Sequence, residues 1–84
     1  MDLEAFLKDV LGSVLDYPEE LNIGIKKTGK QVDVLVYSRQ EDRGRIVGRN
    51  GRMISSLRTL CKAAGEKQGL YVNLELVEDE ADGS

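Results

Sequence analysis

The residues best suited to chemistry form one short stretch, in which a Gly-x-x-Gly turn carrying an arginine and an asparagine follows two aliphatic residues and leads into an amphipathic helix. The candidate binding residues are Arg45, Ile46, Val47, Gly48, Arg49, Asn50, Gly51, Arg52 and Ile54. Two glycines three positions apart let the chain turn tightly and let a bulky group approach the main chain, because neither carries a Cβ atom. The turn leads into a helix whose first N–H groups and dipole favour an anion, and Arg49 and Arg52 add positive charge. The stretch therefore predicts a contact for the phosphate backbone of a nucleic acid.

Charge is unevenly distributed along the 84 residues. The net charge is −3, yet the segment 39–67 holds eight basic and three acidic residues, so the rest of the chain is strongly acidic. A basic segment attracts phosphates locally, whereas an acidic body repels them at longer range. We expect weak binding over a short stretch of nucleic acid.

The composition excludes several kinds of site. Cys61 is the only cysteine and histidine is absent, so an internal disulfide and the usual zinc sites are excluded. We expect no metal and no cofactor, and we expect Cys61 to be a buried small hydrophobe. Ser55 and Ser56 have no evident base nearby in the sequence, so no enzymatic nucleophile is predicted.

Two nucleotide-cofactor motifs are also excluded. Gly44, Gly48 and Gly51 match neither the Gly-x-Gly-x-x-Gly spacing of dinucleotide sites nor the Walker loop. No apolar run approaches the roughly 20 residues of a membrane span and no leader segment is evident, so we expect a soluble, cytoplasmic protein without a membrane partner.

The first half of the chain predicts a helix followed by a hairpin. Apolar residues recur at helical spacing from Leu3 to Leu15, with Asp2 placed to cap the first turn and Pro18 to end the helix. Alternation then predicts a half-buried strand with Leu21, Ile23 and Ile25 inward, a turn at 27–30, and a second strand with Val32, Val34 and Val36 inward.

The second half predicts two helices around the glycine turn and a last strand. Residues 41–47 favour one or two helical turns. The spacing of Met53, Ile54, Leu57, Leu60, Cys61 and Ala64 predicts an amphipathic helix from Arg52 to about Lys67, ended near Gly69. Alternation at 70–76 predicts a third strand, and the acidic segment 78–84 predicts a disordered tail. One domain, residues 1–77, is expected, of α+β class with a three-stranded sheet and helices on one face.

The expected order of elements is helix, strand, strand, helix, Gly-x-x-Gly, helix, strand. The turn Gly48-Arg49-Asn50-Gly51 follows the aliphatic pair Ile46-Val47 and precedes the aliphatic Ile54. This order and this motif together resemble a type II, prokaryotic KH domain. The opening helix running into Asp16-Tyr17-Pro18-Glu19 is similar to that of the small single-domain KhpA family. The resemblance covers residues 1–77.

This resemblance implies a fold and a function. It implies single-stranded RNA or DNA of about four nucleotides, with the Gly48–Gly51 turn clamping its backbone. Ile46, Val47 and Ile54 would pack the turn and floor a groove, and the second strand around Val36 would form its other wall. The implied role is that of an RNA chaperone or post-transcriptional regulator. The motif itself contains no aromatic residue to stack on a base, so we expect low sequence specificity.

Two alternatives remain at this point. A Gly-x-x-Gly turn between two helices needs no ligand, so the motif alone is weak evidence for binding. The rival hypothesis is a protein-interaction module whose helix face assembles a homodimer. KhpA-type proteins, which the chain resembles, also pair with a larger Jag-type KH partner, which implies the same kind of interaction here.

Overall fold

A computed structural model describes residues 2–77, and the expectation of a disordered tail at 78–84 lies outside this range. The helices and strands follow the predicted order: α1 (Leu3–Gly12), β1 (Asn22–Thr28), β2 (Gln31–Tyr37), α2 (Arg43–Val47), α3 (Arg52–Glu66) and β3 (Tyr71–Leu76). Short 3-10 turns lie at Pro18–Glu20, Gln40–Asp42 and Arg49–Gly51.

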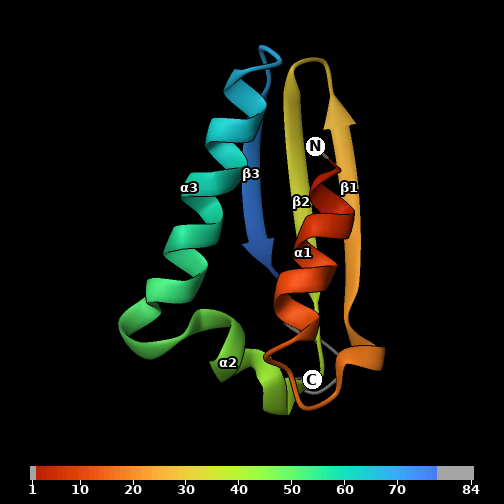
Figure 1. Ribbon diagram of the computed structural model, residues 1–84. Helices are drawn as coiled ribbons and strands as arrows, with labels where there is room; N and C mark the ends of the chain where they lie inside the picture. The colour runs from red at the N-terminus through yellow and green to blue at the C-terminus, as the bar shows by residue number, and fades with distance from the viewer. Residues whose placement is uncertain (1, 78–84) are drawn as a thin grey trace.

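The three strands form one mixed sheet in the order β1-β2-β3. β1 pairs antiparallel with β2, so that Asn22 lies opposite Tyr37, whereas β2 pairs parallel with β3, so that Gln31 lies opposite Tyr71. Both long helices, α1 and α3, cover the same face of the sheet (Figure 1). The α+β class and the type II order α-β-β-α-α-β are confirmed.

The core lies between this face of the sheet and the two long helices. Its centre is formed by Val32, Val34 and Val36 of β2, which are 7%, 0% and 1% exposed. Because alternate residues of a strand point to opposite faces, the predicted inward set of β2 is correct. Cys61 of α3 is fully buried, as predicted, and this burial raises the pKa of its thiol.

Helix α1 begins where the sequence predicted and ends earlier. One carboxylate oxygen of Asp2 accepts hydrogen bonds from the N–H groups of Glu4 and Ala5 at 3.1 and 3.3 Å, which is the predicted N-cap. The helix ends at Gly12, six residues before Pro18, because glycine and serine are weak helix formers and the Ser13 hydroxyl donates to the Val10 carbonyl instead. The prediction that Pro18 ends the helix was therefore wrong.

Strand β1 is less covered than its alternation predicted. Ile25 lies opposite the fully buried Val34, yet it is 48% exposed. β1 is an edge strand, and α1 covers only part of it, so the apolar alternation does not translate into burial at this position. Leu21 is buried as expected, although it precedes the strand.

Gly65 allows α3 to lie close against β3. A Cβ atom at this position would collide with the Cγ2 atom of Val72 and would lie 3.0 Å from the Leu70 carbonyl oxygen. After Gly65 the helix ends within two residues, and Gly69 takes a positive φ of 71° in the turn to β3. The predicted end of this helix near Gly69 is confirmed.

Candidate nucleic-acid interface

The Gly-x-x-Gly turn lies at an outer corner of the molecule, between α2 and α3. Gly48, Asn50 and Gly51 all have positive φ angles, of 79°, 57° and 73°. The N–H of Gly51 donates to the Gly48 carbonyl and that of Arg52 to the Arg49 carbonyl. Two of the N–H groups expected to face an anion are thus used inside the turn, which holds the turn in one shape.

Gly48 is required by the close approach of the following helix. A Cβ atom built on it would lie 2.6 Å from the Cβ and 2.9 Å from the backbone nitrogen of Met53. A side chain here would push the start of α3 away from the end of α2, in addition to the strain of its positive φ. Gly51 has open space around it, so there the backbone conformation alone favours glycine.

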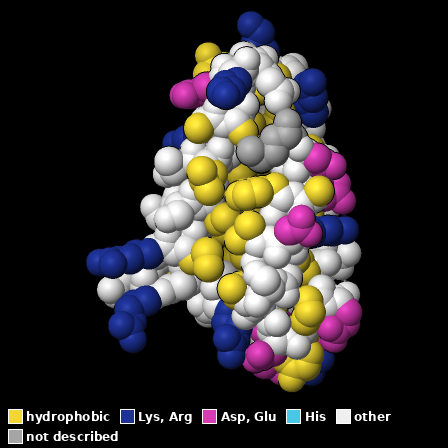
Figure 2. Space-filling view, in the orientation of Figure 1, with side chains coloured by type: hydrophobic (Ala, Val, Ile, Leu, Met, Phe, Trp, Pro, Cys, Tyr) yellow, Lys and Arg dark blue, Asp and Glu magenta, His cyan; other side chains and the backbone are white. Residues whose placement is uncertain are grey.

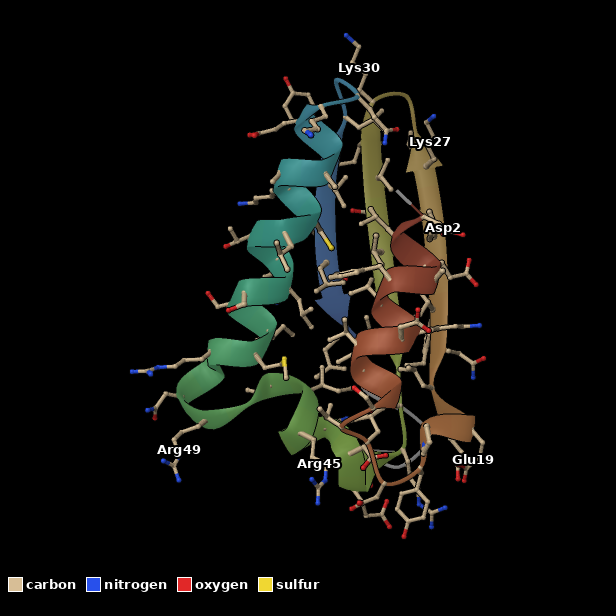
Figure 3. All side chains as sticks on the ribbon, in the orientation of Figure 1. Asp2, Glu19, Lys27, Lys30, Arg45 and Arg49 are labelled. Carbon is tan, nitrogen blue, oxygen red and sulfur yellow. The ribbon has the colours of Figure 1, made fainter. Side chains whose placement is uncertain are left out.

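The polar side chains of the turn face solvent. Arg49, Asn50 and Arg52 are exposed, and Figure 3 shows Arg49 pointing away from the body of the protein. Figure 2 shows Lys and Arg side chains projecting from the same corner. Within residues 2–77, Arg49 and Arg52 form no ion pair or side-chain hydrogen bond. Both guanidinium groups are therefore available to an external anion.

Arg45 is less available than the sequence suggested. Its Nη2 lies 3.2 Å from Oδ2 of Asp16, and both side chains are more than half exposed. An exposed pair of this kind stabilises the fold by about 0–1 kcal/mol. A phosphate can therefore replace Asp16 as the partner of Arg45 at little cost, but the ion pair with Asp16 must first be broken.

Arg39, at the start of the basic segment, is committed to the protein itself. Its guanidinium donates to Glu20 at 2.8 Å and to Glu41 at 3.2 Å, and it lies 4.2 Å from the centre of the Tyr17 ring. The hydrogen bonds to Glu20 and then Glu41 raise the pKa of Arg39. The basic segment is thus weaker as an anion site than its residue count indicates.

The aliphatic residues of the motif lie mostly inside the protein. Ile46 is 1% and Ile54 8% exposed, so they anchor the turn to the core. Half-buried Val47 and Met53 offer what apolar surface lies beside the turn. The expectation that Ile46 and Ile54 also floor an open groove does not fit this burial.

The proposed strand wall of the groove needs correction as well. Val36 is 1% exposed, so its side chain is not available to a ligand, and β2 is the central strand, so its backbone is paired with β1 and β3 along both edges. The hairpin places β1 on one edge of β2, and the crossover through α2 and α3 brings β3 to the other. β3 is therefore the edge strand beside α3, and Arg58 of α3 donates from Nε to the Leu74 carbonyl at 3.1 Å.

Asp42 is a structural residue of this site that the sequence did not reveal. Its side chain is fully buried, and its two carboxylate oxygens accept hydrogen bonds from the N–H groups of Asp16 and Tyr17 at 3.0 and 2.9 Å. Asp42 directly precedes α2, so it ties the helix before the turn to the segment after α1. A charged residue is expected at the surface, and the two N–H groups that bind Asp42 lie 26 and 25 positions away in the sequence. No local pattern therefore indicated its burial.

The described part of the chain gives no alternative site of metal or membrane type. Residues 2–77 contain no group of three or more potential metal ligands, and no helix among them is long and apolar enough to cross a bilayer.

The order of helices and strands around the turn is matched by a known family. The model of the KhpA/KhpB KH domain matches residues 4–76, which is most of the chain. The chain belongs to the KhpA/KhpB KH-domain family. The resemblance noted from the motif is thus confirmed, and so is the expectation that the chain is not an enzyme.

Curated relatives span the same length. The RNA-binding protein KhpA of Listeria monocytogenes serovar 1/2a is 29% identical over 76 residues, 90% of this chain and 100% of that protein. KhpA of Clostridium acetobutylicum is 30% identical over 89% of this chain and 100% of its own. KhpA of Leifsonia xyli subsp. xyli is 32% identical over 87% and 93%.

Proposed function

We propose that this KH domain binds single-stranded RNA, with the Gly48–Gly51 turn holding the sugar-phosphate backbone. The observation that carries the proposal is the pair of exposed arginines, Arg49 and Arg52, which lack partners within residues 2–77 and flank a turn with three positive φ angles. Such a turn brings phosphate oxygens close to the main chain, and the guanidinium groups neutralise them. The name of the relatives, RNA-binding protein, supports the same ligand.

The surroundings of the turn favour low sequence specificity. Val47 and Met53 offer a small apolar surface, while no aromatic side chain lies within the motif to hold a base by stacking. Backbone contacts fix position without reading sequence, and they do not require the 2′-hydroxyl, so single-stranded DNA is expected to bind too. We propose a cytoplasmic RNA chaperone or post-transcriptional regulator that binds its targets with micromolar affinity.

The salt dependence of binding tests the clamp. Roughly three or four neutralised phosphates give a slope of about −2 to −3 in a plot of log affinity against log salt, because each contributes about −0.7 in a single strand. The measurement is fluorescence anisotropy with a labelled single-stranded RNA at several salt concentrations. A slope near zero would contradict phosphate clamping and would favour the interaction-module hypothesis.

A second function, self-association through the helix face, is favoured by an uncovered apolar surface. Leu60 was predicted to lie on the apolar stripe of α3, but it is 50% exposed. Figure 2 shows hydrophobic side chains gathered along the middle of the face that carries α1 and α3. Phe6 and Val10 of α1 are only partly buried against the core. We propose that a second copy of the chain covers this surface. The turn directly precedes α3 and lies at its start, so a dimer would leave the turn of each copy accessible.

Substitution of Leu60 tests the dimer. Leu60→Asp is expected to convert a particle of about twice the 9.3 kDa chain mass into a monomer, because it buries a charge at the interface. The measurement is light scattering after size exclusion. The matched control is Ser55→Asp, also exposed on α3 but about 140° around the helix. Two results would contradict self-association through this surface: a wild-type protein that stays monomeric at tens of micromolar, and a dimer that Leu60→Asp leaves intact. Pairing with another KH protein would then be the remaining form of the interaction hypothesis.

A further inference from the structure

A second candidate contact lies at the end of the molecule remote from the glycine turn. Tyr71, the first residue of β3, is 70% exposed, the highest value among the large hydrophobic side chains of the described residues. It lines a surface hollow of about 250 Å³ together with Lys62, Glu66, Leu70 and Val72. A second hollow, which shares Glu66, Leu70 and Tyr71 with the first, is also lined by Lys30 and Gly69.

The position of Tyr71 is fixed although its ring is exposed. Its N–H donates to the Lys30 carbonyl at 2.8 Å, and the next residue, Val72, is 5% exposed and packs into the core. Figure 3 shows Lys30 and Arg49 at opposite ends of the protein. Tyr71 therefore presents a ring on a rigid backbone at the far end, where folding does not require an aromatic residue.

Helix α3 connects the two ends by a line of polar and basic residues. It runs for 15 residues from Arg52, or about 22 Å at 1.5 Å per residue. Arg58 and Lys62 are four positions apart, and so lie one above the other on the side of the helix that meets the edge of β3. No acidic residue lies on α3 before Glu66.

We propose that the hollow is a second contact for the same single strand, in which one base stacks on Tyr71 and Lys62 binds an adjacent phosphate. This inference rests on the proposed clamp at Gly48–Gly51. At about 3.4 Å per stacked nucleotide, the length of α3 corresponds to about six nucleotides, beyond the four that a KH turn clamps. Glu66 accepts a hydrogen bond from an amino group of the base, which suits a base better than a phosphate in this hollow.

The chemistry of the hollow favours nucleic acid over an apolar partner. A flat exposed ring with a lysine beside it is the combination that single-strand sites use, because every base can stack and the backbone supplies the anion. The side chains of Lys62 and Glu66 would lose water without compensation beneath an apolar protein surface. If the hollow served a protein partner instead, removing Tyr71 would not change how the affinity for RNA depends on RNA length.

The test compares RNAs of four and twelve nucleotides on wild-type protein and on Tyr71→Ala. The twelve-nucleotide RNA is expected to lose about 5- to 150-fold in affinity in the variant, the usual effect of removing one stacking ring, while the four-nucleotide RNA is unaffected. Tyr71→Phe should restore wild-type binding, since it keeps the ring. Lys62→Gln should weaken the longer RNA and make its salt slope shallower by about 0.7.

A matched control removes another exposed tyrosine. Tyr37→Ala deletes a ring that is 41% exposed and lies at the opposite end of β2 from the residue paired with Tyr71, so the longer RNA should bind it as tightly as wild type. Equal binding of the longer RNA by folded Tyr71→Ala and wild type would overturn the second contact while leaving the clamp in place. Failure of wild-type protein to bind either RNA would overturn the clamp and, with it, this proposal.

Discussion

Replacement of both Arg49 and Asn50 by aspartate is expected to lower the affinity for single-stranded RNA by at least about 100-fold. The change removes a charge-assisted hydrogen bond, which contributes about 1.5–3 kcal/mol, and places two anions where phosphates would lie. Both side chains are exposed, and Arg49 has no partner among residues 2–77, so folding should be little affected. The measurement is a gel shift or anisotropy titration.

The control for this variant must match its change in net charge. Lys27→Glu with Thr28→Glu alters the charge by the same three units on β1, at the end of the molecule remote from the turn, and both double variants are compared with the four-nucleotide RNA, which does not reach that end. Circular dichroism should give wild-type spectra and melting temperatures for both double variants. If the folded Arg49→Asp, Asn50→Asp variant bound RNA like the control, the phosphate contact would have to lie elsewhere on the molecule.

Substitution of Asp42 by alanine is expected to cost about 2–4 kcal/mol in the free energy of unfolding. Two backbone N–H groups, of Asp16 and Tyr17, would lose their acceptor, and each such loss costs about 1–3 kcal/mol in a buried setting. A chain of this length has a stability of roughly 4–12 kcal/mol, so the loss is a large fraction of the total. Urea denaturation followed by circular dichroism measures it.

Two further variants locate the cause of that loss. Asp42→Asn keeps the shape of the side chain and one acceptor, so its loss should lie between those of wild type and alanine. Asp9→Ala removes an exposed aspartate from α1 and should change stability by less than about 0.5 kcal/mol. An Asp42→Ala variant as stable as Asp9→Ala would show that water replaces the carboxylate at no cost.

The accuracy of the sequence-based interpretation differs between local and long-range features. Asp2 capped its helix as expected because the cap requires only the residues that follow it. The inward set of β2 was correct because β2 is central and covered by the core along its length. The same reasoning failed for Ile25 and Leu60, which have the right spacing but lack a neighbour that covers them within residues 2–77. Periodicity shows which residues share a face, not how far the opposite layer extends.

The binding residues divide in a similar way. Gly48, Arg49, Asn50, Gly51 and Arg52 lie together because they are consecutive, so the motif alone predicted their proximity. Val36 was placed in the groove wall because the order of strands was not yet known; β2 is the central strand, and Val36 lies on its covered face, where it is 1% exposed. Arg45 and Arg39 counted as free cations in the sequence, whereas folding brings carboxylates to both.

By itself, the sequence determined the class of the fold, the order of its helices and strands, and the location of the glycine turn. Each of these depends on interactions between residues close in the chain: caps, alternation and the conformational freedom of glycine. The tertiary structure decided which strand has an open edge, which arginines are unpaired, that Asp42 is buried and that Tyr71 is exposed beside Lys62. These features depend on contacts between segments distant in the chain, whose partners become neighbours only when α3 and β3 close against the hairpin.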